Sequence, residues 1–285
     1  MSFFSGCDKD EPIPSYLHIP KIDVTTDPGT QGSNDHDVLD AWVYVGGDLV
    51  GVFELPATIP ILTSGTQKLT ILGGVKKNGF VNQRVIYPFL KSFELEKEFI
   101  PSQVDTISPV LSYNENVQFP WIEDFEDGSI SLVRSGSNTT YDSLYITNLE
   151  NEVYQYDGIE NKATGKVEIP LGLQIFENST IANYDLPRSG QEIYLEINFK
   201  CNTEFVVGIY PITGSFISGV PILNLLSTED ASGTMQWKKT YISLKEDVND
   251  PLYNGADFRV FFNAQTNRET GTPTIFIDNI KLVHF

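Results

Sequence analysis

Histidines are the first side chains to consider for catalysis, and the 285-residue sequence has only three: His18, His36 and His284. None of them belongs to a motif with a serine or cysteine nucleophile. The sequence also lacks Gly-x-Ser-x-Gly, His-Glu-x-x-His and a phosphate-binding glycine loop, the motifs that position such groups for reaction. We therefore predict that the protein is not an enzyme.

Acidic side chains are dense at Glu123, Asp124, Glu126 and Asp127, where paired carboxylates would suit glycoside hydrolysis. Neighbours in one strand point to opposite faces of a sheet, so a catalytic pair would need a partner from elsewhere in the chain. In so acidic a sequence we interpret this cluster as the solvated start of a strand.

Aromatic side chains are the candidates for binding rather than reacting, because sugar rings stack on them. In the segment from residue 235 to 241, positions 235, 237, 239 and 241 share one face of a strand, and Lys239 interrupts it, which favours partial exposure. A strand tryptophan in a sandwich is also a common core residue, so both interpretations of Trp237 stay open. The candidates are Trp237, Tyr154, Tyr156, Tyr210 and Tyr241.

The charge balance excludes one class of partner. There are 38 acidic and 19 basic residues, a net charge of −19, and such a surface repels nucleic-acid phosphates and anionic lipid. No apolar run reaches the roughly 18 residues that a membrane-spanning helix needs. Solubility explains the acidity equally well, so the charge alone identifies no partner.

The two cysteines, Cys7 and Cys201, are too few for a zinc ribbon or a disulfide scaffold. A disulfide between them is not expected, because Cys7 precedes any predicted core. We predict that Cys201 is a buried free thiol.

Short strands separated by turn residues run through the chain from Asp37. In the first part they are predicted at 41–45, 49–55, 68–72 and 93–99, with Asn78-Gly79 as the strongest hairpin signal. In the second part they are predicted at 121–125, 143–147, 165–169, 191–199, 204–210, 234–243, 256–263 and 274–283. No segment has a sustained helical stripe, so the fold class is all-β.

Turn-rich stretches divide this pattern into parts. Residues 1–36 and 101–119 contain several prolines and no clear period, which indicates a tether and a linker. Residues 16–19 would add one edge strand to the tether. We expect a small β-sandwich over 37–100 and a larger one, a jelly roll, over 120–285.

Three segments resemble known families. Phe3-Phe4-Ser5-Gly6-Cys7 resembles the lipobox of bacterial lipoprotein precursors, although no basic region precedes it and its apolar run is shorter than the usual length of about 7–15 residues. We expect the signal to begin upstream of Met1. The resemblance implies a covalent lipid on Cys7; the alternative is an ordinary cysteine near the N-terminus.

Asp8-Lys9-Asp10-Glu11 follows the cysteine and resembles the surface-export signal of Bacteroidota lipoproteins. That resemblance implies a lipid-anchored protein on the outer face of the outer membrane. The alternative is a solvated acidic linker.

The segment from Val43 to Gly51, then Leu55-Pro56, then Ser64 to Ile71 resembles PEGA-type domains, which are small Ig-like β-sandwiches. The match covers about 40 residues, and residues 73–99 extend beyond a minimal unit. It implies an enlarged sandwich of this type.

Phe125-Glu126-Asp127-Gly128 and the closing segment Ile275 to Leu282 resemble the first and last strands of carbohydrate-binding-module-like jelly rolls, in which the two ends lie side by side. A structural calcium ion often joins those strands. The resemblance places Glu126 and Asp278 as its ligands, with Asp127 or Asn279 as helpers; the alternative is that Asp278 caps a turn or meets a lysine.

Two functions follow from these resemblances. The first is a non-catalytic surface lipoprotein that serves as an accessory subunit of an outer-membrane β-barrel complex for uptake, secretion or barrel assembly. The second is a glycan-binding lipoprotein of a surface polysaccharide-utilisation system, with Trp237, Tyr154, Tyr156 and Tyr241 in contact with the sugar. Fold resemblance alone does not decide between them.

Overall fold

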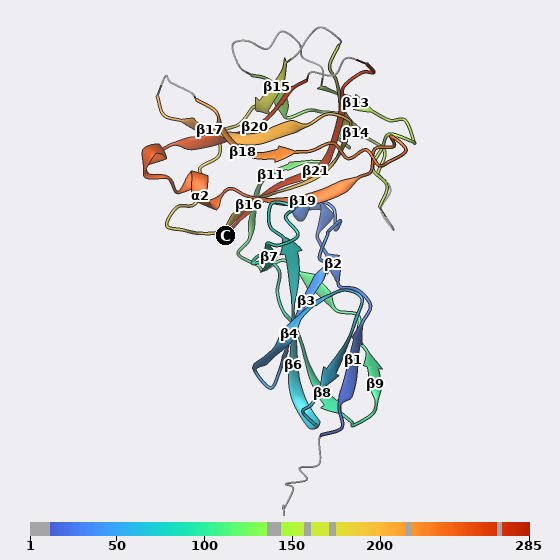
Figure 1. The fold of residues 1–285 in the computed structure, drawn as a ribbon. Coiled ribbons are helices and arrows are strands. Elements are labelled where there is room, and N and C mark those ends of the chain that lie inside the picture. Colours follow the sequence, from blue (N-terminus) through green and yellow to red (C-terminus); the bar gives the residue numbers. More distant parts are fainter. Residues whose placement is uncertain (1–11, 136–143, 157–160, 171–174, 215–217, 267–269) are drawn as a thin grey trace, which may run out of the picture.

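The computed structural model describes residues 12–135, 144–156, 161–170, 175–214, 218–266 and 270–285, and these form two stacked domains (Figure 1). Residues 12–117 are called the small domain and residues 118–285 the large domain. Each contains sheets that pack on a shared apolar core. The all-β prediction is confirmed. Among the described residues, no helix is both long and apolar enough to cross a membrane.

The small domain is a sandwich whose first sheet has the order β4-β3-β6-β7, with β8 also paired to β6. Its strands are β3 (Asp40–Val45), β4 (Asp48–Glu54), β6 (Gly65–Lys76), β7 (Arg84–Ile86) and β8 (Phe93–Phe99). The other face is a sheet of order β5-β1-β9 and a pair β10-β2. These strands are β1 (Ser15–Ile19), β2 (Asp23–Thr25), β5 (Ala57–Ile61), β9 (Val104–Thr106) and β10 (Val110–Ser112).

The predicted tether over 1–36 is wrong for residues 15–25, which form β1 and β2 within the small domain. Strand β1 lies between β5 and β9, so it is a central strand and not the edge strand that we predicted. Alternation directs Leu17 and Ile19 into the core, where both are fully buried. Strong burial on one face explains why a proline-rich segment is nevertheless a structural strand.

The predicted linker over 101–119 is wrong as well, because β9 and β10 pair in parallel with β1 and β2. Leu111, Tyr113 and Val117 are buried in the core of the small domain. Two three-residue strands between prolines have too few residues to show a period, which is why the sequence did not reveal them.

The large domain has one sheet of order β13-β14-β21-β16-β19, with β11 also paired to β21, and a second of order β12-β15-β20-β17-β18. The first sheet contains β11 (Gln118–Glu123), β13 (Leu144–Thr147), β14 (Thr164–Glu168), β16 (Ile193–Cys201), β19 (Lys238–Ser243) and β21 (Thr274–His284). The second contains β12 (Leu132–Arg134), β15 (Ile175–Thr180), β17 (Phe205–Ile212), β18 (Val220–Leu225) and β20 (Asp257–Gln265). Short helical turns are α1 (Pro28–Gln31), α2 (Lys245–Val248) and η1 (Pro251–Tyr253).

The first and last strands of the large domain, β11 and β21, pair antiparallel. The two ends of the domain therefore lie side by side, as the jelly-roll resemblance implied. Strand β16 shows how the core forms. Its alternate residues from Ile193 to Cys201 point between the two sheets. Cys201 is a buried free thiol, as predicted, and burial raises its pKa to about 12.

The other face of β16 is also buried, because the small domain packs on it (Figure 1). Tyr87 and Tyr113 of the small domain both donate from Oη to Oε1 of Glu196, at 2.6 and 2.7 Å. Tyr87 also packs against Tyr194, with ring centroids 5.6 Å apart. A carboxylate of the large domain is therefore hydrogen-bonded by two hydroxyls of the small domain.

Lys239 balances the charge of this interface. Its Nζ lies 3.3 Å from Oε2 of Glu196 and 3.2 Å from Oδ2 of Asp35, and its side chain is 3% exposed. Burial raises the pKa of Glu196, but Lys239, Lys281 and the two tyrosines outweigh it, so the pKa is lowered. Because Asp35 belongs to the small domain, Lys239 joins carboxylates from both domains.

The turn between β6 and β7 extends the first sheet of the large domain. Lys77 forms a parallel bridge with Tyr241, and the Asn78 amide donates to the Tyr241 carbonyl at 2.8 Å. Oδ1 of Asn78 accepts from the Ser243 amide at 2.9 Å. Asn78 and Gly79 both have positive φ, 56° and 73°, which this residue pair adopts readily. The predicted turn residues thus also hold the two domains together.

Replacing Lys239 with methionine tests this interface. The Lys239→Met variant removes the cation that pairs directly with both Glu196 and Asp35, and we expect it to lower the free energy of unfolding by about 3–5 kcal/mol. The pKa of Glu196 is lowered in the folded protein, so its charge stabilises above the unfolded pKa of about 4.3 and this stabilisation is lost as the pH falls through the folded-state pKa. Urea unfolding at pH 7 and at pH 4 measures both effects.

Lys245→Met is the matched control. Lys245 pairs with Glu192, and both side chains are about a third exposed. An exposed ion pair contributes about 0–1 kcal/mol, so equal losses in the two variants would contradict a stabilising role for the buried cluster.

Candidate functional site

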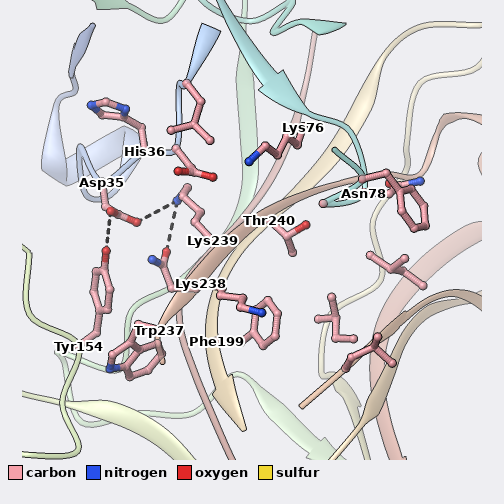
Figure 2. Close-up of a pocket in the computed structure, with 18 of the residues that line it drawn as sticks. Asp35, His36, Lys76, Asn78, Tyr154, Phe199, Trp237, Lys238, Lys239 and Thr240 are labelled. Atoms are coloured by element: carbon pink, nitrogen blue, oxygen red, sulfur yellow. Dashed lines mark hydrogen bonds and ion pairs between the residues drawn. The ribbon is translucent and has the colours of Figure 1, made fainter. Parts of the chain in front are cut away.

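A pocket of about 680 Å³ lies at the junction of the two domains, open to solvent (Figure 2). The small domain contributes the segment 35–39 and the β6–β7 turn, and the large domain contributes β16, the end of β18 and the start of β19. Aromatic and polar side chains alternate around it. The lining includes Asp35, His36, Asp37, Lys76, Asn78, Phe80, Tyr154, Tyr156, Asn198, Asn224, Trp237, Lys238, Lys239 and Thr240.

A row of aromatic rings runs along the pocket, formed by His36, Tyr156, Tyr154 and Trp237. The rings of His36 and Tyr156 are 6.4 Å apart, and those of Tyr156 and Tyr154 are stacked at 6.5 Å. Tyr154 then meets Trp237 edge to face at 5.0 Å. Three of the four predicted sugar-binding aromatics are thus brought together, and we call them, with His36, the aromatic row.

Trp237 is half-buried and lies outside the core of the large domain. Nζ of Lys200 lies 4.9 Å from its ring centroid, and Phe276 packs beside it at 6.3 Å. The sequence left open whether Trp237 is a core residue or a surface platform. The structure places it at the edge of the pocket, in a cation–π contact with Lys200, and not in the core.

Tyr154 connects the aromatic row to the ionic cluster. Its Oη donates to Oδ1 of Asp35 at 2.7 Å, and its backbone N–H donates to Oγ1 of Thr164 at 3.1 Å. Both oxygens of Asp35 are engaged, since Oδ2 faces Lys239. The ring orientation is therefore fixed before a ligand arrives.

The prediction for Tyr241 is wrong. Its side chain is 2% exposed, its ring packs on Tyr87 at 4.9 Å, and its Oη accepts from the Asp37 amide. It lies inside the domain interface, where no sugar reaches it. Tyr210, the remaining aromatic candidate, lies on the second sheet of the large domain, where its hydroxyl donates to Glu177 and its ring packs on Phe261.

Sequence reasoning missed the part of the site that the small domain contributes. Residues 35–37 fell in the predicted tether, and the β6–β7 turn was predicted only as a hairpin. Burial lowers the pKa of His36, so its ring is neutral at pH 7. Burial also raises the pKa of Asp37, opposed by Lys76. No local motif signals these positions, because the pocket exists only where the domains meet.

The acidic cluster at the start of the large domain is partly structural, which corrects the prediction of a solvated strand start. Glu123 is buried and accepts from the amides of Phe125 and Ser131 and from the Ser131 hydroxyl. Asp127 is exposed and caps its own turn by accepting from Ser129. These carboxylates serve the turn after β11 and do not face one another as a catalytic pair would.

Glu126 and Asp278 both hold the segment 161–164. Oε1 of Glu126 accepts from the amides of Lys162 and Ala163, and Oδ2 of Asp278 accepts from the Thr164 hydroxyl at 2.6 Å. Burial, and then the charges of Glu126 and Asp124, raise the pKa of Asp278 well above its usual range. A divalent cation would relieve this repulsion.

Oδ1 of Asn279 is buried and has no hydrogen-bond partner among the described residues. Those residues contain no group of three or more His, Cys, Asp or Glu side chains arranged for a metal. A calcium ion held by Glu126 and Asp278, with the amide oxygen of Asn279 as a helper, would have the oxygen ligands that calcium prefers and stays a prediction. Asp127 is committed to its turn and is not among them.

No family model matches the sequence, and no curated protein matches it either. A solved carbohydrate-binding module of the β-sandwich superfamily, known for promiscuous specificity, is similar at 18% identity over 85% of this chain and 84% of its own, with a TM-score of 0.38.

Two further solved structures are similar over somewhat more than half of the chain. The K1 cleaved adhesin domain of Lys-gingipain from Porphyromonas gingivalis has 16% identity over 57% of this chain and 96% of its own, with a TM-score of 0.37. A carbohydrate-binding module specific for non-crystalline cellulose has 12% identity over 56% and 90%, with a TM-score of 0.37. Likenesses this distant carry no argument about a ligand.

Calcium binding at Asp278 is testable by melting. At calcium one hundred times its Kd, binding to the folded state would add about 2.7 kcal/mol, which raises the Tm by roughly 5–10 °C for a domain of this size. Calorimetry in calcium and in chelator should show this shift for the wild type and for the control Asp127→Asn, but not for Asp278→Asn. Equal Tm values for the wild type in both buffers would contradict the predicted calcium site.

Proposed function

We propose that the protein is a non-catalytic glycan-binding protein whose site is the pocket at the domain junction. The observation that carries the proposal is the aromatic row, in which Tyr154, Tyr156 and Trp237 line one open pocket. Sugar rings present C–H faces that pack on aromatic rings, and burial of that surface supplies the binding free energy.

Polar groups around the row suit the hydroxyls of a sugar. The side chains of Asn78, Asn224 and Thr240 line the pocket beside the rings. A mixture of apolar platforms and a few oriented donors and acceptors is typical of small-molecule sites. The aromatic rings would therefore provide affinity, while these side chains would select among sugars.

The pocket offers binding groups rather than a reaction. Asp35 is engaged by Tyr154 and Lys239, and Nδ1 of His36 accepts from the Val38 amide. A general acid and base with free access to a substrate would need different surroundings. This supports a binding role.

The other expectations concern where the protein works. Cys7 lies outside the described residues, so its lipid, and with it the cell-surface position on the outer membrane, stays a prediction. The role as a subunit of an outer-membrane β-barrel complex and the PEGA-type resemblance of the small domain also stay predictions. The pocket favours the glycan-binding alternative, which we therefore place first.

Trp237→Ala should abolish measurable binding to the glycans that the wild-type protein binds. Stacking of a nucleic-acid base on an aromatic side chain contributes about 1–3 kcal/mol. If a sugar ring on Tyr156 contributes a similar amount, Tyr156→Ala should weaken binding by about tenfold. A glycan array identifies ligands, and titration calorimetry measures their Kd for each variant.

The matched control is Trp42→Ala, which removes another half-buried tryptophan, from β3 of the small domain and away from the pocket. Its glycan affinity should equal that of the wild type. If a broad array gives no ligand, or if Trp237→Ala binds as the wild type does, the proposed site is wrong.

Lipidation of Cys7 is tested on protein extracted from the membranes of the producing cells. We expect mass spectrometry to find an N-terminal cysteine carrying a diacylglycerol, and Cys7→Ser to release the protein from the membrane fraction. An unmodified native N-terminus, or one upstream of Cys7, would exclude the anchor.

A further inference from the structure

The pocket at the domain junction has a charge opposite to that of the chain. The whole sequence has 38 acidic and 19 basic residues, whereas the pocket is lined by three lysines and two aspartates. Cationic groups gathered in a concave site concentrate the field and attract anions, even on an acidic protein. The lining charges are Asp35, Asp37, Lys76, Lys238 and Lys239.

Two of these charges neutralise each other, because Asp35 and Lys239 form a buried ion pair at 3.2 Å. The charges that remain for a ligand are those of Lys76, Lys238 and Asp37. Asp37 interacts with Lys76, whose charge opposes the rise that burial causes in the pKa of Asp37. The pocket therefore keeps a positive balance, with two ammonium groups and one carboxylate.

Neither lysine has a carboxylate within 4 Å of its Nζ in the part of the chain that the structure describes. Lys76 is the last residue of β6 in the small domain and is half-buried, and Lys238 is the first residue of β19 in the large domain and is exposed. An ammonium group from each domain thus lines the same pocket as Trp237. Figure 2 shows this arrangement.

Thr240 adds a second sign that a polar ligand belongs here. It lines the pocket, it is 3% exposed, and its hydroxyl has no hydrogen-bond partner among the described residues. A Cβ on Gly79 would lie 3.3 Å from that hydroxyl, so the glycine allows the β6–β7 turn to pack closely against it. An unpaired buried hydroxyl costs about 1–3 kcal/mol.

We propose that the pocket binds an acidic glycan, in which a pyranose ring packs on the aromatic row and its carboxylate or sulfate is held by Lys76 and Lys238. The inference rests on the proposed glycan-binding function and specifies its ligand. Ammonium groups of both domains then bind one anionic sugar, so the selectivity of the site depends on the domain junction. A neutral glycan would use the same rings without these charges.

The test uses the full chain and three oligosaccharide series of equal length: neutral, uronate-containing and sulfated. Titration calorimetry should give a Kd for one acidic series at least about tenfold below that of the neutral series, since a hydrogen bond to a charged group contributes about 1.5–3 kcal/mol. The affinity for that series should fall as salt is raised from low to physiological concentration. Whether uronate or sulfate binds more tightly distinguishes the two anions.

The double variant Lys76→Gln/Lys238→Gln should lose this preference and bind acidic and neutral oligosaccharides alike. The control Lys68→Gln removes an exposed lysine near the other end of β6, 52% exposed and paired with Glu94, and should keep the preference. Circular dichroism and melting verify that each variant is folded.

The outcomes separate the inference from the function on which it rests. If neutral and acidic series bind equally, or the double variant keeps the preference, the acidic-glycan inference is wrong while glycan binding stands. If no series binds, or binding survives Trp237→Ala, both are wrong.

Discussion

Lys239 makes the contact on which the rest of this molecule depends, because its ammonium group lies between Glu196 of the large domain and Asp35 of the small domain. All three groups are removed from water, and moving charges out of water is costly unless each has partners. Tyr87 and Tyr113 supply the remaining hydrogen bonds of Glu196. Separating the domains would expose this cluster and break the contacts that Asp35, Tyr87 and Tyr113 make across the interface. The two sandwiches are therefore held together by buried contacts and not only by the chain that joins them.

The buried contacts between the domains explain how a pocket made from two domains can bind a ligand. Tyr154 is part of both the ionic cluster and the aromatic row. Its hydroxyl donates a hydrogen bond to Asp35, and its ring packs between those of Tyr156 and Trp237. The orientation of the ring is set by the interface before a sugar arrives. Groups that are already ordered lose little conformational entropy on binding, which leaves more of the contact energy as affinity. The interface is thus also the support of the site.

The sequence predicted what depends on local pattern. Strand β16 was found because its apolar residues alternate, and Tyr154 and Tyr156 were among the aromatic candidates for sugar binding. Patterns of this kind identify the inward face of a strand but not what covers its outward face. Glu196 and Lys239 lie at outward positions, where a solvent-facing charge is the ordinary expectation. Only the packing of the small domain makes them buried. That domain is built partly from β1, predicted only as an edge strand, and from the unrecognised strands β2, β9 and β10.

Tyr241 shows the same limit at the site itself. It shares a strand face with Trp237, so alternation alone makes the two equally suited to a sugar. Trp237 lies at the pocket, just before β19 begins. Tyr241, four residues further on, lies in the interface, where Lys77 and Asn78 pair with the edge of β19. Trp237 therefore meets solvent and Tyr241 meets Tyr87. The boundary between binding surface and interface is set by where the β6–β7 turn ends, and the same turn places Gly79 beside Thr240 and leaves Lys76 at the pocket. Site and interface are thus two parts of one strand, divided by a single turn of the other domain.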